Sequence, residues 1–172
     1  METLALYDRD GKLLEQVLER DHGLPTVPEG VYWRVCEVWI VNGKGEILIQ
    51  RRALTKPNWP GAWCESAGGA QQAGETQEQC CLRETMEEIG VALDFEHGGL
   101  AFVYTGKTAH HDVWVFRMDV PLESLTFQPE EVIDAKYATP EEIKRLERAG
   151  EFVTHPYLDR MLDVLPVLLS AY

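Results

Sequence analysis

Residues 69–91, GAQQAGETQEQCCLRETMEEIGV, decide the fold of this chain. The stretch from Thr76 to Ile89 is rich in helix-forming residues, and Thr76 is a residue type that commonly precedes a helix. It ends at Gly90, and glycine is the residue that most often closes a helix at its C-terminus. The sequence therefore predicts a loop, then a helix over 76–89, then a second loop.

The two sides of this predicted helix differ in chemistry. At about 100° per residue, three apolar side chains fall within about 60° of arc and predict a core-facing stripe: Leu82, Met86 and Ile89. Three carboxylates fall on the opposite side, within about 100° of one another, and are expected to face solvent: Glu84, Glu87 and Glu88.

Three carboxylates on one helical face repel one another and weaken the helix unless something compensates. Arg83 lies one turn before Glu87 and can pair with it, but a single guanidinium cannot neutralise three acids. Oxygen ligands are what Mg²⁺ or Mn²⁺ prefers, so a divalent cation can supply the missing charge. An isolated ExxEE pattern is more often a solvated acidic face, and the surrounding residues decide between the two interpretations.

Those surrounding residues stand at fixed spacings: Gly69, Glu75, Arg83, Glu84, Glu87, Glu88 and Gly90. The pattern resembles the Nudix box, G-x5-E-x7-R-E-U-x-E-E-x-G-U, where U is a bulky aliphatic residue. Every fixed position matches, and the one departure is Thr85 at the first U, since Val91 satisfies the second. The resemblance implies an α/β/α sandwich with a mixed sheet flanked by helices, and we expect one domain over residues 1–172.

The resemblance also implies a hydrolase that cleaves the diphosphate link of a small nucleoside-diphosphate-type or related substrate. It implies Mg²⁺ or Mn²⁺ held by the three glutamates, with Arg83 orienting them. Gly69 would let the loop turn tightly, and Glu75 would tie loop to helix. The general base is implied to be a glutamate of the helix or of a later loop, where Glu130 and Glu131 are candidates. An exposed acidic loop is an equally weighted interpretation of that pair.

A second stretch, EILIQRRALTKPNWPGAW over residues 46–63, resembles the corresponding segment of isopentenyl-diphosphate isomerase. In that family the residues that match Arg52 and Lys56 bind the substrate diphosphate, and charge-assisted hydrogen bonds suit this role. The catalytic cysteine of the isomerases aligns with Gly68, and two of their metal-binding histidines align with Ala70 and Trp33. Cys64 lies four residues before the cysteine position. We therefore expect a hydrolase, with an isomerase-like enzyme or a non-catalytic phosphometabolite-binding module as alternatives.

The rest of the chain predicts strands and helices that interleave without regular alternation, which favours a mixed sheet flanked by helices. Strands are expected in two runs around an Asp-Gly turn in 3–21, where a helix from Leu13 is the alternative, and over 31–42, 46–52, 91–93, 100–104, 113–120 and 132–137. Loops are expected over 22–30 and 53–63. Helices are expected after Thr139-Pro140 and over 157–172, with a kink or break at Pro166.

Composition narrows the functional classes. The 172 residues carry a formal net charge of −13, which disfavours nucleic-acid polymers and anionic membranes as partners. No apolar run approaches the roughly 18 residues of a membrane span, and residues 1–12 resemble no targeting segment. The four cysteines form no CxxC pair, so free thiols and a cytoplasmic protein are expected. A homodimer is plausible.

Five further side chains carry weaker signals. Trp59 and Trp63 flank the Pro-Gly turn and could stack on a base, although loop or core anchors are the better interpretation. His110 and His111 are interpreted as an exposed pair at a strand end. His155 is expected to cap or pack against the last helix.

Overall fold

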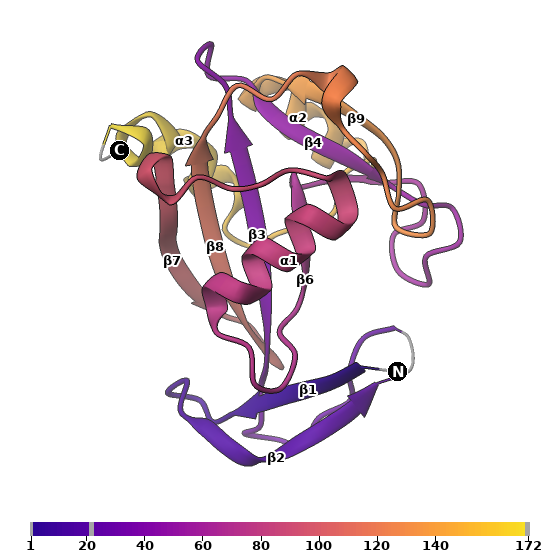
Figure 1. The fold of residues 1–172 in the computed structure, drawn as a ribbon, viewed down its shortest axis with the longest axis vertical. Helices are drawn as coiled ribbons and strands as arrows, with labels where there is room; N and C mark the ends of the chain where they lie inside the picture. Colours follow the sequence, from indigo (N-terminus) through magenta and orange to yellow (C-terminus); the bar gives the residue numbers. More distant parts are fainter. Residues whose placement is uncertain (1, 21–22, 171–172) are drawn as a thin grey trace.

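The computed structural model describes residues 2–20 and 23–170. A mixed sheet forms its centre, with α1 across one face and with α2 and α3 on the other (Figure 1). The expected mixed α/β sandwich is confirmed. Asp21 and His22, within the first expected strand pair and loop, and residues 171–172 of the expected last helix lie outside the described residues.

The main sheet runs in the order β5-β4-β3-β8-β7, with β6 pairing to β3 and β9 to β4. Its strands are β3 (Trp33–Val41), β4 (Ile47–Arg52), β5 (Trp63–Cys64), β6 (Ala67–Ala70), β7 (Gly98–Thr105), β8 (Ala109–Arg117) and β9 (Val132–Ala138). β3 and β8 pair in parallel and the other pairs are antiparallel. The central strand β3 therefore touches both the returning strand β4 and the small-residue strand β6.

Each face of the sheet has its own apolar core, because successive side chains of a strand point to opposite faces. Cys36, Val38 and Ile40 of β3 pack on the α1 side. Trp39 and Val41 pack on the side of α2 and α3. The near-continuous apolar run of β3 is thus explained by burial on both faces.

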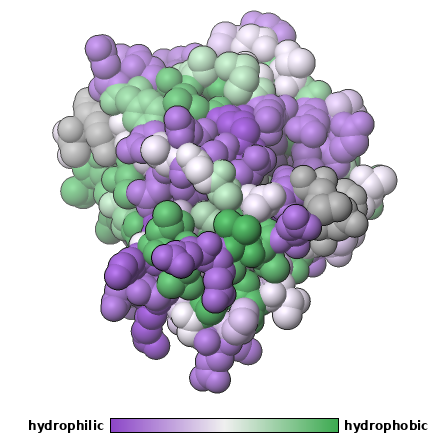
Figure 2. Space-filling view, turned by 60° about the horizontal axis from the view of Figure 1, so that its bottom comes forward, coloured by the Kyte–Doolittle hydropathy of each residue, from purple (hydrophilic) through white to green (hydrophobic). Residues whose placement is uncertain are grey.

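The expected N-terminal hairpin is confirmed as β1 (Glu2–Tyr7) paired with β2 (Leu13–Arg20). The side chain of Asp8 holds its turn, accepting hydrogen bonds from the backbone N–H groups of Asp10 (3.0 Å) and Lys12 (2.9 Å). The hairpin stands beside the loop before α1, and hydrophobic and hydrophilic residues are interspersed on this end of the molecule (Figure 2).

Helix ends follow the capping residues that the sequence offers. α1 (Gln77–Ile89) begins after Thr76, whose side chain caps the N–H of Gln79, and it ends at Gly90 with φ 73°. α2 (Pro140–Arg148) begins after Thr139 with proline in its first turn, as expected. α3 (Leu158–Leu169) continues through Pro166, so the break expected there is absent. No helix of the described residues is long and apolar enough to span a membrane.

One expected strand is absent, and two observed strands were not expected. Residues 91–93 form no strand; Val91 and Leu93 are buried against the sheet, so their hydrophobicity reflects packing rather than pairing. β5 and β6 were not expected, because a two-residue strand inside a Pro- and Gly-rich loop and the run AGGA lack the β-branched residues that mark strands.

Candidate metal and diphosphate site

Helix α1 buries a different face from the one expected, although Ile89 is buried and Glu87 exposed as expected. Leu82 and Met86 are 40% and 50% exposed, whereas Glu88 is only 5% exposed. The buried side of the helix consists of Cys80, Cys81, Thr85, Glu88 and Ile89. The expected core stripe of Leu82 and Met86, and the solvent-facing position of Glu88, are therefore wrong, and two of the three acids point toward the sheet.

The reason is the small-residue strand β6, which lets α1 approach closely. A Cβ placed on Gly69 would lie 2.2 Å from the carboxyl carbon of Glu84, so the missing side chain makes room for that carboxylate. Gly69 lies in a strand and pairs with Cys36. Its expected role in a tight turn is thus replaced by a steric one, while Gly90 does adopt the left-handed conformation.

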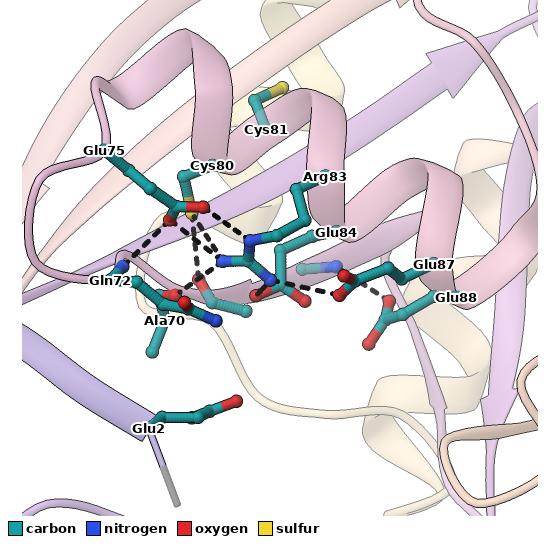
Figure 3. A network of polar contacts seen from close by, with 12 residues as sticks. Glu2, Ala70, Gln72, Glu75, Cys80, Cys81, Arg83, Glu84, Glu87 and Glu88 are labelled. Atoms are coloured by element: carbon teal, nitrogen blue, oxygen red, sulfur yellow. Dashed lines mark hydrogen bonds and ion pairs between the residues drawn. The ribbon is translucent and has the colours of Figure 1, made fainter. Parts of the chain in front are cut away.

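Arg83 is the hub of a polar network that ties the loop to α1 (Figure 3). Its guanidinium binds both carboxylate oxygens of Glu75, with Nε–Oε1 at 2.6 Å and Nη2–Oε2 at 3.0 Å. Nη1 reaches Glu84 at 2.8 Å and Glu87 at 3.1 Å. Glu75 also accepts the N–H of Gln72 at 2.9 Å, so the position of Glu75 fits its expected loop-to-helix role.

The negative charges of the three acids Glu75, Glu84 and Glu88 are compensated to different extents. Burial raises the pKa of Glu75, but the hydrogen bond from Arg83 outweighs it, so the pKa lies below its ordinary value. Burial raises the pKa of Glu84 to about 7 in spite of Arg83. Burial, with the charge of Glu84 added, raises the pKa of Glu88 to about 8. Two carboxylates therefore lack enough positive charge.

Glu88 is held by one of its two oxygens. Its Oε2 accepts the backbone N–H of Gly68 at 3.0 Å and the side-chain amide of Gln50 at 2.8 Å. Gln50 lies in β4 and is buried, and its Oε1 finds no hydrogen-bond partner among residues 2–20 and 23–170. A buried amide oxygen beside two under-compensated acids marks a place where a hydrogen-bond donor or cation is missing.

This donor set fits a hard divalent cation, because it consists of carboxylate and amide oxygens. Within the described residues no three His, Cys, Asp or Glu side chains already converge as a complete metal cage. The Arg83 guanidinium holds Glu84 and Glu87 instead. Glu87 is 52% exposed at its side chain, the most exposed of these acids.

The residues expected to bind diphosphate lie at the Glu88 end of α1. Lys56 forms an ion pair with Glu131, the candidate base, and the N–H of Ala53 binds the Glu131 carbonyl at 2.8 Å. The N–H of Gln128 binds the carbonyl of Glu88 at 3.1 Å, so this loop continues from the helix end. Arg52 donates from Nε to the carbonyl of Asn58 at 3.2 Å. Glu131 is thus not simply part of an exposed acidic loop.

The positions that the isomerase chemistry would need are occupied by packing. A Cβ on Gly68 would lie 2.7 Å from the carbonyl oxygen of Cys36, so a thiol there would require the backbone to shift. Ala70 and Trp33 are buried apolar residues. Burial raises the pKa of the Cys64 thiol well above its ordinary value, which makes it a poor nucleophile or proton carrier.

A second cluster of ionisable groups lies on the other face of β3. His155, as an imidazolium, stands between Glu65 (3.0 Å) and Glu37 (3.4 Å). Glu37 also binds His111 at 2.8 Å and accepts the hydroxyl hydrogen bond of Tyr157. His155 is buried and packs beside α3, as expected.

The expectation of an exposed histidine pair at the start of β8 was wrong. His110 is buried between the carbonyl of Asp8 (2.8 Å) and the hydroxyl of Thr105 (3.0 Å), and His111 binds Glu37. Trp59 is 45% exposed with φ 52°, and Trp63 lies in β5 with the Lys136 ammonium 4.7 Å from the centre of its ring.

Sequence reasoning missed Gln50, Glu65 and the role of Glu37. The available signal was a polar residue inside an apolar strand: Gln50 in ILIQRR and Glu37 in VCEVWIV. A buried polar group needs a partner, so such residues point to a network or a site. Glu65 sits in a short loop between β5 and β6 and offers no such signal.

A mixed sheet between helices, with a cluster of acids on a loop–helix–loop, is an arrangement typical of enzymes that bind a divalent cation. Comparison with known proteins identifies the family. A model of the NUDIX domain matches residues 32–159. An uncharacterized Nudix hydrolase of Listeria monocytogenes is 38% identical over 130 residues, 76% of this chain and 77% of that protein. One from Pseudomonas aeruginosa is 34% identical over 170 residues, covering 94% and 96%. The chain belongs to the Nudix hydrolase family.

Relatives named as isomerases and solved structures agree with this assignment. An isopentenyl-diphosphate Delta-isomerase of Brevibacterium linens is 30% identical over 181 aligned positions, 100% of this chain and 96% of that protein. A crystal structure from Deinococcus radiodurans superposes with TM-score 0.75 at 27% identity, covering 94% and 98% of the two chains. The recognition of a Nudix enzyme with isomerase-like segments is confirmed.

Proposed function

We propose that this chain is a Mg²⁺- or Mn²⁺-dependent hydrolase that cleaves the diphosphate link of a small nucleoside-diphosphate-type or related substrate. One observation carries the proposal. Glu84 and Glu88 are buried carboxyl groups with raised pKa values beside Glu87, and Arg83 is already shared between Glu75 and this group. A divalent cation is the simplest charge that completes the set.

In this proposal Glu84, Glu87 and Glu88 hold the cation, and Arg83 keeps the first two in place. A bound divalent cation supplies Lewis-acid stabilisation of phosphate oxygens. Gly68 and Gly69 leave room for this site because they have no side chain. A side chain at either position would collide with Cys36 or Glu84.

Lys56 and Arg52 would bind the substrate diphosphate, and Glu131 would act as general base. The substrate offers Lys56 a competing anion, so its arrival would draw the ammonium away from Glu131 and free that carboxylate. Glu131 then takes a proton from the attacking water. The water oxygen forms a new bond to phosphorus as the bridging P–O bond breaks, and the second phosphate leaves with the bridging oxygen.

A substrate screen in ¹⁸O-labelled water tests the proposal. Nucleoside diphosphate derivatives, nucleoside triphosphates, prenyl diphosphates and coenzyme-type diphosphates are incubated with Mg²⁺ or Mn²⁺, and products are identified by mass. We expect one class to yield two phosphate-bearing products with ¹⁸O in one of them, and no turnover in excess chelator. Binding without product in every class would support a non-catalytic module, and turnover in chelator would contradict the metal role.

The isomerase alternative is tested with the same protein. We expect no conversion of isopentenyl to dimethylallyl diphosphate, because Gly68 and Ala70 replace the needed thiol and imidazole. If dimethylallyl product forms and Cys64→Ser abolishes it, the hydrolase proposal gives way to the isomerase.

A further inference from the structure

Resting on the proposed function, we propose that Gln50 is a positioning residue of the cation site: its amide holds Glu88 in place and presents a second, open oxygen to the ion's hydration shell. The basis is the juxtaposition of a buried strand side chain with a box carboxylate. Gln50 is 3% exposed, and it is the β4 residue whose side chain reaches Glu88.

The first half of the role is visible in the hydrogen bonds. Gln50 Nε2 and the Gly68 N–H both donate to Oε2 of Glu88, at 2.8 and 3.0 Å. A carboxylate that serves as a metal ligand is ionised and only accepts hydrogen bonds, so in the cation-bound state the amide nitrogen of Gln50 must face it, as it does here. Both donors thus occupy one oxygen and leave Oε1 of Glu88 available as a ligand. Partners of this kind orient metal ligands in proteins generally.

The second half follows from the atom that remains. With its nitrogen on Glu88, Gln50 leaves Oε1 buried and without a partner in the part of the chain that the structure describes. A buried acceptor without a donor destabilises the folded state unless a hydrogen-bond donor arrives. Mg²⁺ usually keeps several waters when protein ligands bind it, and each water is a hydrogen-bond donor. The hydrated ion therefore supplies what Gln50 lacks.

The backbone fixes the geometry of this arrangement. Gln50 pairs with Cys64 on one side and with Ala135 on the other, so its strand is held between β5 and β9. The Cys64 thiol also donates to the Gln50 carbonyl at 3.7 Å. Gln50 is thus presented to Glu88 from a central position in the sheet rather than from a loop.

The test is Mn²⁺ affinity, measured from free Mn²⁺ by electron paramagnetic resonance, in wild type and Gln50→Met. Methionine keeps the length and loses both polar atoms. We expect the Mn²⁺ dissociation constant to rise about ten- to a hundredfold. Gln71→Met is the matched control, because Gln71 is equally buried but binds Tyr7 and the Glu75 carbonyl, and its affinity should stay within about twofold of wild type.

Gln50→Asn provides a second variant if methionine prevents folding, because asparagine keeps the amide but falls short of Glu88. Wild-type affinity in a folded Gln50 variant would overturn the role of Gln50 and leave the proposed function intact. An equal loss of Mn²⁺ affinity in Gln71→Met would also overturn this role, because the loss would then follow from replacing any buried glutamine. A wild-type protein that binds no Mn²⁺ would instead contradict the proposed function itself.

Discussion

The two faces of β3 carry two groups of buried acids that balance their charge in different ways. Glu37 and Glu65 enclose His155 as an imidazolium, so one cation lies between two acids. Glu84 and Glu88 have only the Arg83 guanidinium nearby, and it is also engaged by Glu75 and Glu87. The negative charge is therefore much less compensated in the second group than in the first.

The pKa values express this difference. Burial raises the pKa of Glu37, but hydrogen bonds from His111 and His155 outweigh it and leave it well below its ordinary value. Burial lowers the pKa of His155, but Glu65 and Glu37 raise it to about 10. The pKa values of Glu84 and Glu88 rise to about 7 and 8. The first group of acids is therefore stabilised by its own cation, and the second group is the one that we propose binds a divalent cation.

The largest expected effect is on the cluster of Glu37 and Glu65. His155→Leu should lower the free energy of unfolding by about 3–5 kcal/mol, because it removes the imidazolium that lies between Glu37 and Glu65. Urea unfolding measures the change. His97→Leu is the control, since His97 forms an exposed pair with Asp94 whose loss should change stability far less. Equal losses in the two variants would mean that the Glu37 cluster is not a structural ion pair.

The cluster of Glu84 and Glu88 should respond in activity rather than stability. Glu88→Gln should lower the turnover number roughly a hundredfold or more, equivalent to about 3 kcal/mol or more of transition-state stabilisation. The chelator-treated variant should stay folded, because glutamine removes a buried acid whose charge is poorly compensated. Steady-state kinetics and thermal melting measure both. Glu78→Gln on the exposed side of α1 should leave turnover unchanged, and full activity in Glu88→Gln would contradict the site.

The two clusters should also differ in their dependence on pH. The folded pKa of Glu88 is raised, so in chelator the folded state binds more protons, and stability falls as pH rises from about 5 to about 8. The pKa of His155 is also raised, so its contribution is fully present below about 6.5 and is lost as pH rises toward 10.

Unfolding experiments across pH separate these two effects. The stability advantage of Glu88→Gln over wild type should grow between pH 5 and 8. The deficit of His155→Leu should shrink from pH 6.5 toward 10. Parallel profiles for the two variants would remove the distinction between the clusters.

The smallest expected effect concerns the diphosphate clamp. Changing Arg52 and Lys56 together to alanine should weaken binding of every diphosphate ligand alike, about tenfold or more, because charge-assisted hydrogen bonds are lost. The Michaelis constant and direct ligand titration measure it. Lys136→Ala, which removes a lysine paired with Glu142, is the control. Unchanged affinity in the double variant would remove the clamp and leave the cation site untouched.

The sequence predicted the family, the α1 helix and the fold class because a fixed spacing of charged and glycine residues is a local signal. It misplaced the face of α1, since Leu82 and Met86 follow helical periodicity while Cys80, Cys81 and Thr85 do the packing. Small residues on β6 decide that orientation, and a pattern of hydrophobicity along one helix carries no information about its partner strand. Gln50 and Glu37 stand out as polar residues in apolar strands, but their partners lie 38 to 120 residues away, and no local pattern specifies which residues these are.

The central claim is that the acids of α1 require a divalent cation, and Mg²⁺-linked stability tests it most directly. At a Mg²⁺ concentration of about a hundred times its dissociation constant, the melting temperature at pH 7.5 should rise by about 5–10 °C relative to chelator. At pH 5, where protons occupy Glu84 and Glu88, the rise should be much smaller. A melting temperature that does not change with Mg²⁺ at either pH would contradict the account.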